Sequence, residues 1–270
     1  MPPPRRLAVT ARPRVIALAN QKGGVGKTTT AINLATGLAT IGKRVLIVDL
    51  DPQGNASTGL GILRSERQNG TYEVLMGLAE LGASVHEAAL PGLHIAPSTA
   101  DLSGAEIELI DLERRSYRLR DALEAGVGHY DFILIDCPPS LGLLTINALV
   151  AANSVMVPLQ CEFYALEGLS MLLATIERLK RRYNPDLQIQ GVVLTMFDQR
   201  NNLAGQVAAD VRDHLGDKVY ETVIPRNVRV SEAPSHGRPA ILYDHRCAGS
   251  VAYMRLASEM LRRESEPRAA

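Results

Sequence analysis

The glycine-rich segment at residues 20–29, Asn-Gln-Lys-Gly-Gly-Val-Gly-Lys-Thr-Thr, restricts the fold of this chain more than any other feature. Its glycines lack a Cβ and tolerate positive φ, so consecutive backbone N–H groups can wrap closely around an anion. The apolar run Val15 to Ala19 is typical of a buried parallel strand, and apolar residues recur at helical spacing from Ile32 to Ile41. Strand, glycine-rich loop and helix in this order indicate a phosphate-binding loop.

The side chains at the end of this segment suit a triphosphate and a metal ion. Lys27 is placed to reach the β- and γ-phosphates, and the Thr28 hydroxyl is placed to ligate Mg²⁺. The helix that begins there points its partly positive N-terminus at the anion. We therefore expect a nucleotide to be held by Gly23, Gly24, Val25, Gly26, Lys27, Thr28 and Thr29.

Three aspartates that follow two predicted strands extend this site. The strand Arg44 to Val48 runs into Asp49 and Asp51, and the strand Phe132 to Ile135 runs into Asp136. Ligands gather at the carboxyl ends of parallel strands, beside the phosphate loop. Asp136 has the Walker B arrangement, a carboxylate that closes an apolar strand and binds Mg²⁺ through water. Asp49 is expected to be a supporting carboxylate, and for Asp51 a solvated turn is the alternative, because Asp-Pro is common turn chemistry.

The remaining pattern predicts an α/β fold, a doubly wound, mostly parallel sheet with helices on both faces. Further strands are predicted at Ser154–Leu159, Ile189–Met196 and Tyr220–Ile224, and helices at Leu143–Ala151, Leu166–Tyr183 and Gly249–Arg263. We expect one domain over residues 14–263, because no linker or repeat divides it. Residues 1–13 are expected to form a disordered basic arm, too short for a further domain, and residues 264–270 a polar tail.

Two details of the glycine-rich segment, together with two later segments, carry a family resemblance. Gln21 stands where the general phosphate-loop pattern has glycine, and Lys22 follows it. Lys22 is poorly placed for its own nucleotide but could cross a two-fold axis to a partner's phosphates; a surface lysine is the alternative. This loop resembles the deviant Walker A box of the ParA/MinD ATPases. With residues 195–203 and 223–237, the chain is similar to the chromosomal ParA (Soj) proteins over residues 14–261.

The resemblance implies an ATPase that uses ATP and Mg²⁺ and forms a homodimer when ATP is bound. It implies catalytic roles for Lys22 acting in trans, for Lys27, and for Asp51, which would position the attacking water. The implied metal residues are Thr28, Asp51 and Asp136, and the implied adenine contacts are Pro225 and Asn227. Implied partners are non-specific double-stranded DNA and a ParB-type centromere-binding protein that stimulates hydrolysis, with a replication initiator as a further candidate partner.

Net charge alone does not point to DNA, because lysines plus arginines equal aspartates plus glutamates at 29 each. Between residues 226 and 263, however, seven arginines stand against three acids. Few aromatic residues are available for base stacking, so binding is expected to be independent of sequence and sensitive to salt. Ordinary surface charge is the alternative for each arginine. The arginines expected to contact DNA are Arg200, Arg229, Arg226, Arg238 and Arg246.

Two other functions share the nucleotide motifs. One is a MinD-like or cargo-positioning ATPase on another scaffold; the other is a nucleotide-switched regulator of replication initiation. A membrane partner is not expected, because the chain has no run of about 20 apolar residues and its tail lacks bulky apolar groups. Cys137, Cys161 and Cys247 lack the spacing of a zinc site, and Cys137 is expected to be a small buried residue. The expected location is the cytoplasm, on the nucleoid.

Overall fold

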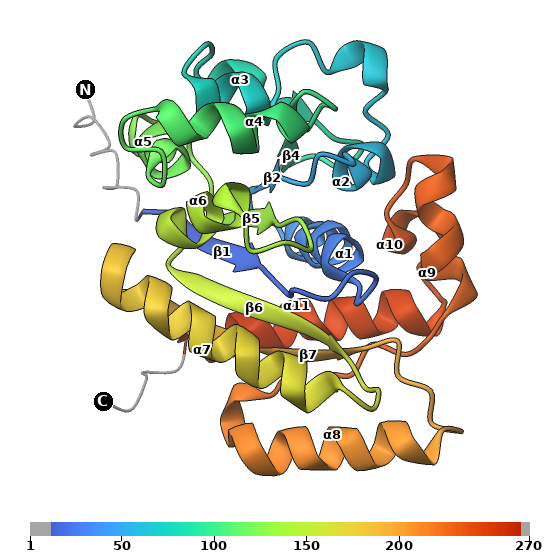
Figure 1. The fold of residues 1–270 in the computed structure, drawn as a ribbon. Helices are drawn as coiled ribbons and strands as arrows, with labels where there is room; N and C mark the ends of the chain where they lie inside the picture. Colours follow the sequence, from blue (N-terminus) through green and yellow to red (C-terminus); the bar gives the residue numbers. More distant parts are fainter. Residues whose placement is uncertain (1–11, 266–270) are drawn as a thin grey trace, which may run out of the picture.

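The chain folds around a seven-stranded sheet in the computed structural model, which describes residues 12–265 (Figure 1). The strand order is β3-β4-β2-β5-β1-β6-β7, and every neighbouring pair is parallel except β3 and β4. The strands are β1 (Arg14–Leu18), β2 (Val45–Asp49), β3 (His86–Glu87), β4 (Leu93–Ala96), β5 (Phe132–Asp136), β6 (Ser154–Gln160) and β7 (Gln188–Thr195). The predicted doubly wound α/β fold is confirmed.

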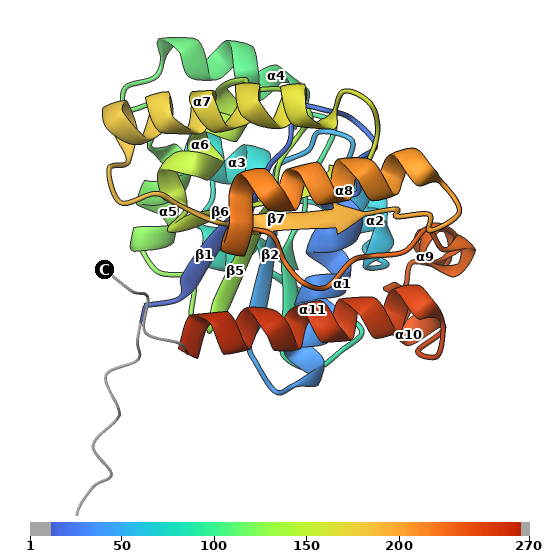
Figure 2. The ribbon, with the colours of Figure 1, turned by 90° about the horizontal axis from the view of Figure 1, so that it is seen from below.

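Helices cover both faces of the sheet, and Figure 2 shows α7 and α11 on opposite sides of it. The helices are α1 (Lys27–Thr40), α2 (Asn55–Gly59), α3 (Thr71–Met76), α4 (Leu102–Glu108), α5 (Arg118–Glu124), α6 (Leu143–Ala151), α7 (Ala165–Tyr183), α8 (Asn202–Leu215), α9 (Val228–Glu232), α10 (Ala240–Tyr243) and α11 (Ala248–Ser265). Successive side chains of a strand point to opposite faces, so each strand feeds two cores. In β1, Val15 and Ala17 join the core under α3 to α8, while Ile16 and Leu18 join the core under α1 and α11.

The strand register brings the predicted site together at one edge of the sheet. Asp49 at the end of β2 is level with Asp136 at the end of β5, and Asp136 is level with Leu18 at the end of β1. The glycine-rich loop leaves β1 two residues after Leu18. Three adjacent strands therefore deliver the loop and both aspartates to the same carboxyl edge, as expected of a parallel α/β sheet.

The predicted strand at Tyr220–Ile224 is wrong. This segment runs beside β7, and the amides of Tyr220 and Ile224 donate to the Val192 and Leu194 carbonyls at 2.9 and 2.8 Å, but only isolated bridges form, at the flanking Val219 and Pro225. A strand would need its amides for the ladder, but the amides of Glu221 and Thr222 donate to the buried Glu259 carboxylate of α11 at 2.8 and 2.9 Å. A side chain from a distant helix thus interrupts the ladder between Tyr220 and Ile224, and a local apolar run gives no sign of that contact.

The ends of the domain meet at the opposite edge of the sheet. Arg14 at the start of β1 pairs with Glu264 at 3.2 Å, and α11 continues to Ser265, two residues past its predicted end. Most of the predicted basic arm and polar tail, residues 1–11 and 266–270, lies outside the described residues. Within residues 12–265, no helix combines the length and the apolar composition needed to cross a membrane.

Glu259→Gln is expected to lower the free energy of unfolding by about 2 kcal/mol, because Glu259 is buried and bonds two amides and the Arg263 guanidinium. Burial acts to raise the pKa of Glu259, but the hydrogen bonds from Thr222 and Glu221 and the charge of Arg263 bring it below its usual value. A lowered folded pKa stabilises the fold above the unfolded pKa of about 4, and this stabilisation is lost as pH falls through the folded pKa.

Urea denaturation of wild type and Glu259→Gln as a function of pH measures this contribution. The difference in unfolding free energy should be full at neutral pH and should shrink below about pH 4. The matched control is Glu221→Gln, since the Glu221 side chain is exposed and makes a surface pair with Arg262. The control should change stability by less than about 0.5 kcal/mol. A difference that does not change with pH would contradict the assignment.

Candidate nucleotide and magnesium site

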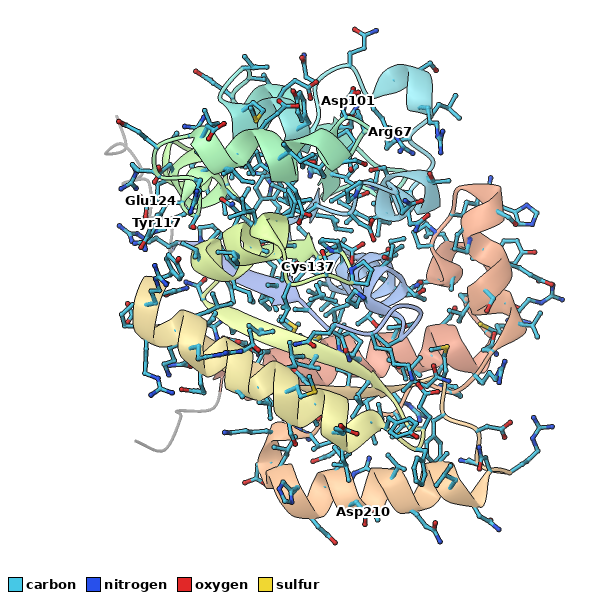
Figure 3. All side chains as sticks on the ribbon, viewed as in Figure 1. Arg67, Asp101, Tyr117, Glu124, Cys137 and Asp210 are labelled. Atoms are coloured by element: carbon cyan, nitrogen blue, oxygen red, sulfur yellow. The ribbon has the colours of Figure 1, made fainter. Side chains whose placement is uncertain are left out.

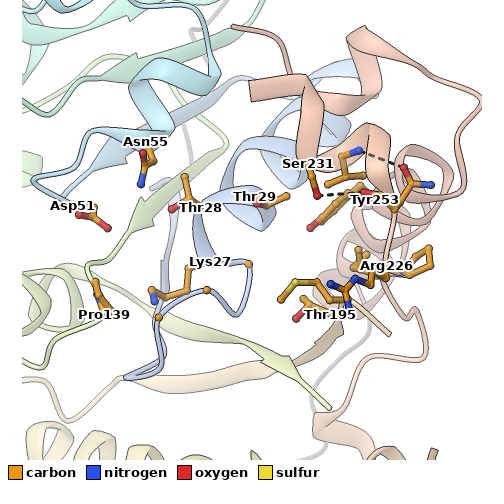
Figure 4. Close-up of a pocket in the computed structure, with 18 of the residues that line it drawn as sticks. Lys27, Thr28, Thr29, Asp51, Asn55, Pro139, Thr195, Arg226, Ser231 and Tyr253 are labelled. Atoms are coloured by element: carbon orange, nitrogen blue, oxygen red, sulfur yellow. Dashed lines mark hydrogen bonds between the residues drawn. The ribbon is translucent and has the colours of Figure 1, made fainter. Parts of the chain in front are cut away.

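A cavity of about 460 Å³ opens at the carboxyl edge of the sheet (Figure 4). It is bounded by the glycine-rich loop and the start of α1, the loops after β2 and β5, the end of β7, and residues 224–231. Its size falls within the range of small-molecule sites. The predicted nucleotide and metal residues that line it are Gly23, Gly24, Gly26, Lys27, Thr28, Thr29, Asp51, Pro225 and Asn227.

The glycine-rich loop owes its shape to two left-handed residues and one buried hydrogen bond. Gly24 and Gly26 have φ of 74° and 87°, a conformation that side chains with a Cβ rarely adopt. The Thr195 hydroxyl at the end of β7 donates to the Val25 carbonyl at 2.8 Å, fixing the loop from behind. No side chain of the described residues caps the N-terminus of α1. Its first amides are therefore available to an anion.

Lys27 lies inside this loop, close to negative charge. Its side chain is buried, and its Nζ donates to the Lys22 carbonyl at 3.1 Å. Burial lowers the pKa of Lys27, and the carboxylates of Asp136 and Asp51 act in the opposite direction. A phosphate in the cavity would add a stronger negative partner, which is the environment that a nucleotide-binding lysine requires.

The Asp136 carboxylate is fully buried and is poorly satisfied by the protein. Neither of its oxygens accepts a well-formed hydrogen bond from a described residue, although the Thr28 hydroxyl is close enough to lower its pKa in part. Burial, followed by the neighbouring charge of Asp49, raises the pKa of Asp136 well above its usual value. A buried carboxylate with this little compensation is costly unless a cation joins it.

Asp49 is also fully buried, but it is well satisfied. Its oxygens accept hydrogen bonds from the Ser57 amide and hydroxyl at 2.9 and 2.7 Å and from the Asp51 amide at 3.2 Å. Burial, partly offset by the bonds from Ser57, raises the pKa of Asp49 to about 6. This geometry fits the supporting role expected for Asp49.

Asp51 forms the expected turn, yet it does not lie in solvent. It is 8% exposed and lines the cavity, and its Oδ1 accepts from the Gln53 amide at 3.0 Å. The described residues hold no cluster of three or more His, Cys, Asp or Glu residues of the kind that binds a metal unaided. Mg²⁺ commonly binds one or two carboxylates plus substrate phosphates and water, so Thr28, Asp51 and Asp136 suit Mg²⁺ that arrives with a nucleotide.

Lys22 lies outside the cavity of its own chain. Its side chain is 52% exposed and forms an ion pair with Glu162, in the loop between β6 and α7. A lysine in this position is accessible to a second molecule and does not face its own phosphate loop. The trans role of Lys22 stays a prediction.

Several residues of the site were not identified from the sequence. Thr195, Tyr253, Asn55 and Pro139 line the cavity from four separate segments. Tyr253 is fully buried in α11, with its hydroxyl 3.3 Å from that of Thr30 in α1. These residue types are common in any chain, and only the fold brings them together. Cys137 is fully buried, as expected.

The arginines predicted to contact DNA occupy different environments. Arg200 makes a two-pronged pair with Asp198, at 2.9 and 2.7 Å, and Arg229 pairs with Glu232 at 3.1 Å. Asp198 has its pKa lowered to about 2 by the hydrogen bonds from Arg200. Arg226 lines the nucleotide cavity, whereas Arg238 and Arg246 are exposed elsewhere. The DNA contacts remain predictions.

Asp136→Asn is expected to stabilise the nucleotide-free protein, because it removes a buried charge while keeping the side-chain shape. We expect the melting temperature to rise by about 3 °C, corresponding to about 1 kcal/mol. The same variant should lose most of the additional stabilisation by Mg²⁺ and ATP. Thermal melting with and without Mg²⁺ and ATP measures both effects. Asp210→Asn on the exposed face of α8 is the control and should behave as wild type; a destabilised Asp136→Asn would contradict the assignment.

The chain is similar to known proteins along most of its length. Residues 13–189 match the family model described as an AAA domain. The chain is 63% identical over 258 residues to the chromosome partitioning protein ParA of Caulobacter vibrioides, covering 95% of this chain and 97% of that one. It is 55% identical over 247 residues to the sporulation initiation inhibitor protein Soj of Bacillus subtilis, covering 92% and 98%.

A solved structure extends the comparison to the bound nucleotide. It is described as cobyrinic acid a,c-diamide synthase from Mycobacterium smegmatis with bound ADP and magnesium. The two folds agree with a TM-score of 0.82 and 38% identity, over 95% of this chain and 97% of that chain. A relative of the same architecture therefore binds a nucleotide together with magnesium.

Proposed function

The chain belongs to the ParA/Soj family of chromosome-partitioning ATPases, and we propose that ATP and Mg²⁺ switch it between a DNA-binding dimer and a released monomer. It is an ATPase, its nucleotide is ATP and its metal is Mg²⁺. The observation that carries the proposal is that Lys27, Thr28 and Asp51 line one cavity, while the buried Asp136 lies close to all three at the end of β5.

Hydrolysis requires charge neutralisation and an oriented water, because phosphoryl transfer depends on positioning and electrostatics. Lys27 would neutralise the β- and γ-phosphates, and the first amides of α1 would hold their oxygens. Thr28 and Asp136 would hold Mg²⁺, which would neutralise charge on the same phosphates. Asp51, at the rim of the cavity, would orient the attacking water. The glycine-rich loop contains no arginine, so slow unstimulated turnover is expected.

The half-exposed Lys22 supports a face-to-face dimer. In the ATP state, we infer that Lys22 leaves Glu162 and reaches the γ-phosphate in the partner subunit. The exchange replaces a solvent-screened surface pair, worth at most about 1 kcal/mol, with a contact to a multiply charged anion. Dimerisation would then depend on the triphosphate, and hydrolysis would separate the subunits.

DNA is the proposed scaffold, and a ParB-type protein the proposed stimulator of hydrolysis. Two subunits side by side would double the number of arginines facing one duplex, which converts weak contacts into tight binding. The cytoplasm, on the nucleoid, is the proposed location. Control of a replication initiator and a MinD-like role on another scaffold are the alternatives. The curated partitioning relatives are more similar to this chain than the synthase structure is, so partitioning takes precedence over a synthase reaction.

Lys22→Ala should retain ATP binding but fail to form the ATP-dependent dimer. Analytical ultracentrifugation with Mg²⁺ and ATP, paired with a nucleotide-binding titration, separates the two effects. Lys27→Ala should lose both properties, because its ammonium contacts the nucleotide of its own chain. Lys43→Ala, a lysine after α1 and far from the loop, should keep both. A normal ATP dimer of Lys22→Ala would refute the trans role.

Asp51→Ala should form a long-lived ATP dimer that binds random-sequence duplex DNA, with affinity falling steeply as salt rises. The test compares ATP with ADP across a salt series. Adding Arg229→Glu to the Asp51→Ala protein should leave the dimer intact and weaken DNA binding at least tenfold. Sedimentation with liposomes serves as the scaffold control. Absence of DNA binding with either nucleotide would favour the MinD-like alternative, and wild-type hydrolysis by Asp51→Ala would refute its catalytic role.

A further inference from the structure

Arg67, labelled in Figure 3, is a buried arginine that pairs with no carboxylate of the described residues. It donates to the Gly54 carbonyl, three residues after Asp51. It is 6% exposed and sits in the loop between α2 and α3. Its guanidinium donates five hydrogen bonds, as many as it has N–H groups. The acceptors are the carbonyls of Ile62 (3.2 and 2.8 Å), Gly54 (3.4 Å) and Ser98 (3.2 Å) and the Thr58 hydroxyl (2.8 Å).

The charge of Arg67 is buried without a counter-charge in contact with it among the described residues. All of its acceptors are neutral, so no ion pair among the described residues offsets its desolvation. Burial lowers the pKa of Arg67, and only the nearby charge of Asp49 acts to raise it. An apolar side chain would avoid the cost of burying the charge but would leave the Ile62, Gly54 and Ser98 carbonyls without this donor. What the arginine supplies instead is a rigid set of directed bonds.

Those bonds join three pieces of the site. Gly54 is the N-cap of α2, with φ of 62°, and its amide donates to the Asp51 carbonyl at 2.8 Å. The Gly54 carbonyl accepts hydrogen bonds from Arg67 and from the amide and hydroxyl of Thr58, the latter two at 3.0 Å. The fit is close, because a Cβ on Gly54 would lie 2.4 Å from Nη1 of Arg67.

The third piece is the loop that follows β4. The Ser98 carbonyl accepts from Arg67, while the Ser98 amide donates to the Ser57 hydroxyl at 3.0 Å. That hydroxyl in turn donates to the Asp49 carboxylate at 2.7 Å. Arg67 therefore connects the turn at residues 51–54, helix α2 and the loop after β4 in one hydrogen-bonded unit.

We propose that Arg67 is a positioning residue for hydrolysis, which holds the turn at residues 51–54 so that Asp51 keeps its place at the cavity. Arg67 does not line the cavity, so it acts through Asp51 and not on the nucleotide. The inference rests on the catalytic role proposed for Asp51. The glycine-rich loop is positioned by β1 and by the hydrogen bond from Thr195, not by Arg67. Nucleotide binding should therefore not depend on Arg67.

The test compares Arg67→Gln and Arg67→Lys with wild type in steady-state ATP hydrolysis by the full chain with Mg²⁺. Arg67→Gln should lower kcat by about 10- to 100-fold, the scale of a misplaced catalytic group, and leave the KM for ATP and the affinity for ADP within about threefold. Arg67→Lys should recover part of the loss, because one ammonium keeps the charge but not the planar set of donors. Hydrogen exchange at the Gly54 and Thr58 amides should be faster in Arg67→Gln, with the amides of residues 23–29 unchanged.

Arg118→Gln is the matched control. Arg118 is a half-buried arginine of α5 whose Nε donates to the Leu75 carbonyl at 2.7 Å, and it lines a different cavity, away from the nucleotide site. The Arg118→Gln variant should lower the melting temperature without changing kcat. Arg67 variants that lower only the melting temperature, or that raise KM as much as they lower kcat, would overturn the inference. Asp51→Ala in the same assay tests the underlying role separately: its failure to slow hydrolysis would refute the proposed function of Asp51 whatever Arg67 does.

Discussion

The structure depends on the register of three adjacent parallel strands, β2, β5 and β1. Their carboxyl ends place Asp49, Asp136 and the glycine-rich loop side by side, with two carboxylates fully buried on neighbouring strands. Slipping one strand by a residue would reverse its side chains across the sheet and exchange the two cores. The same pairing that fixes the core therefore fixes the geometry of the site.

This register also concentrates charge that the protein does not fully compensate. Asp49 has Ser57 as a partner, and Lys27 lies close to Asp136, but the Asp136 oxygens lack well-formed hydrogen bonds from the described residues. Functional sites often retain such unfavourable groups because the substrate or metal later satisfies them. In this chain the packing of the surrounding apolar strands and of α1 against α11 offsets the free-energy cost of burying these carboxylates. Gly37 of α1 permits that packing, since a Cβ there would lie 3.0 Å from the Cβ of Ala257.

Sequence patterns predicted the parts of the fold that local chemistry decides. Apolar runs located β1, β2, β5, β6 and β7, and the glycine-rich loop with the aspartates that follow β2 and β5 located the cavity. The strand predicted at Tyr220–Ile224 was wrong because Glu259, 37 and 38 residues later, binds two of its amides. Arg67 and Thr195 could not be recognised for a similar reason: the carbonyls they hold become neighbours only in the folded chain. Short elements at residues 55–125 were not assigned, because their apolar periodicity is too brief to distinguish helix from loop.

The carboxylates beside Arg200 and Arg229 change what these arginines can contribute to an electrostatic surface. Each guanidinium already has an anionic neighbour, Asp198 for one and Glu232 with Asp244 for the other. A DNA phosphate that approached these arginines would have to displace or share the carboxylate that already pairs with each of them. The electrostatic attraction gained would therefore be smaller than the number of arginines suggests. Fewer condensed cations would be released from a duplex per arginine, and the entropy gained on contact would be smaller. At these two positions a single copy of the chain attracts a polyanion less than its arginines alone would, so tight attachment would require several such surfaces to act together.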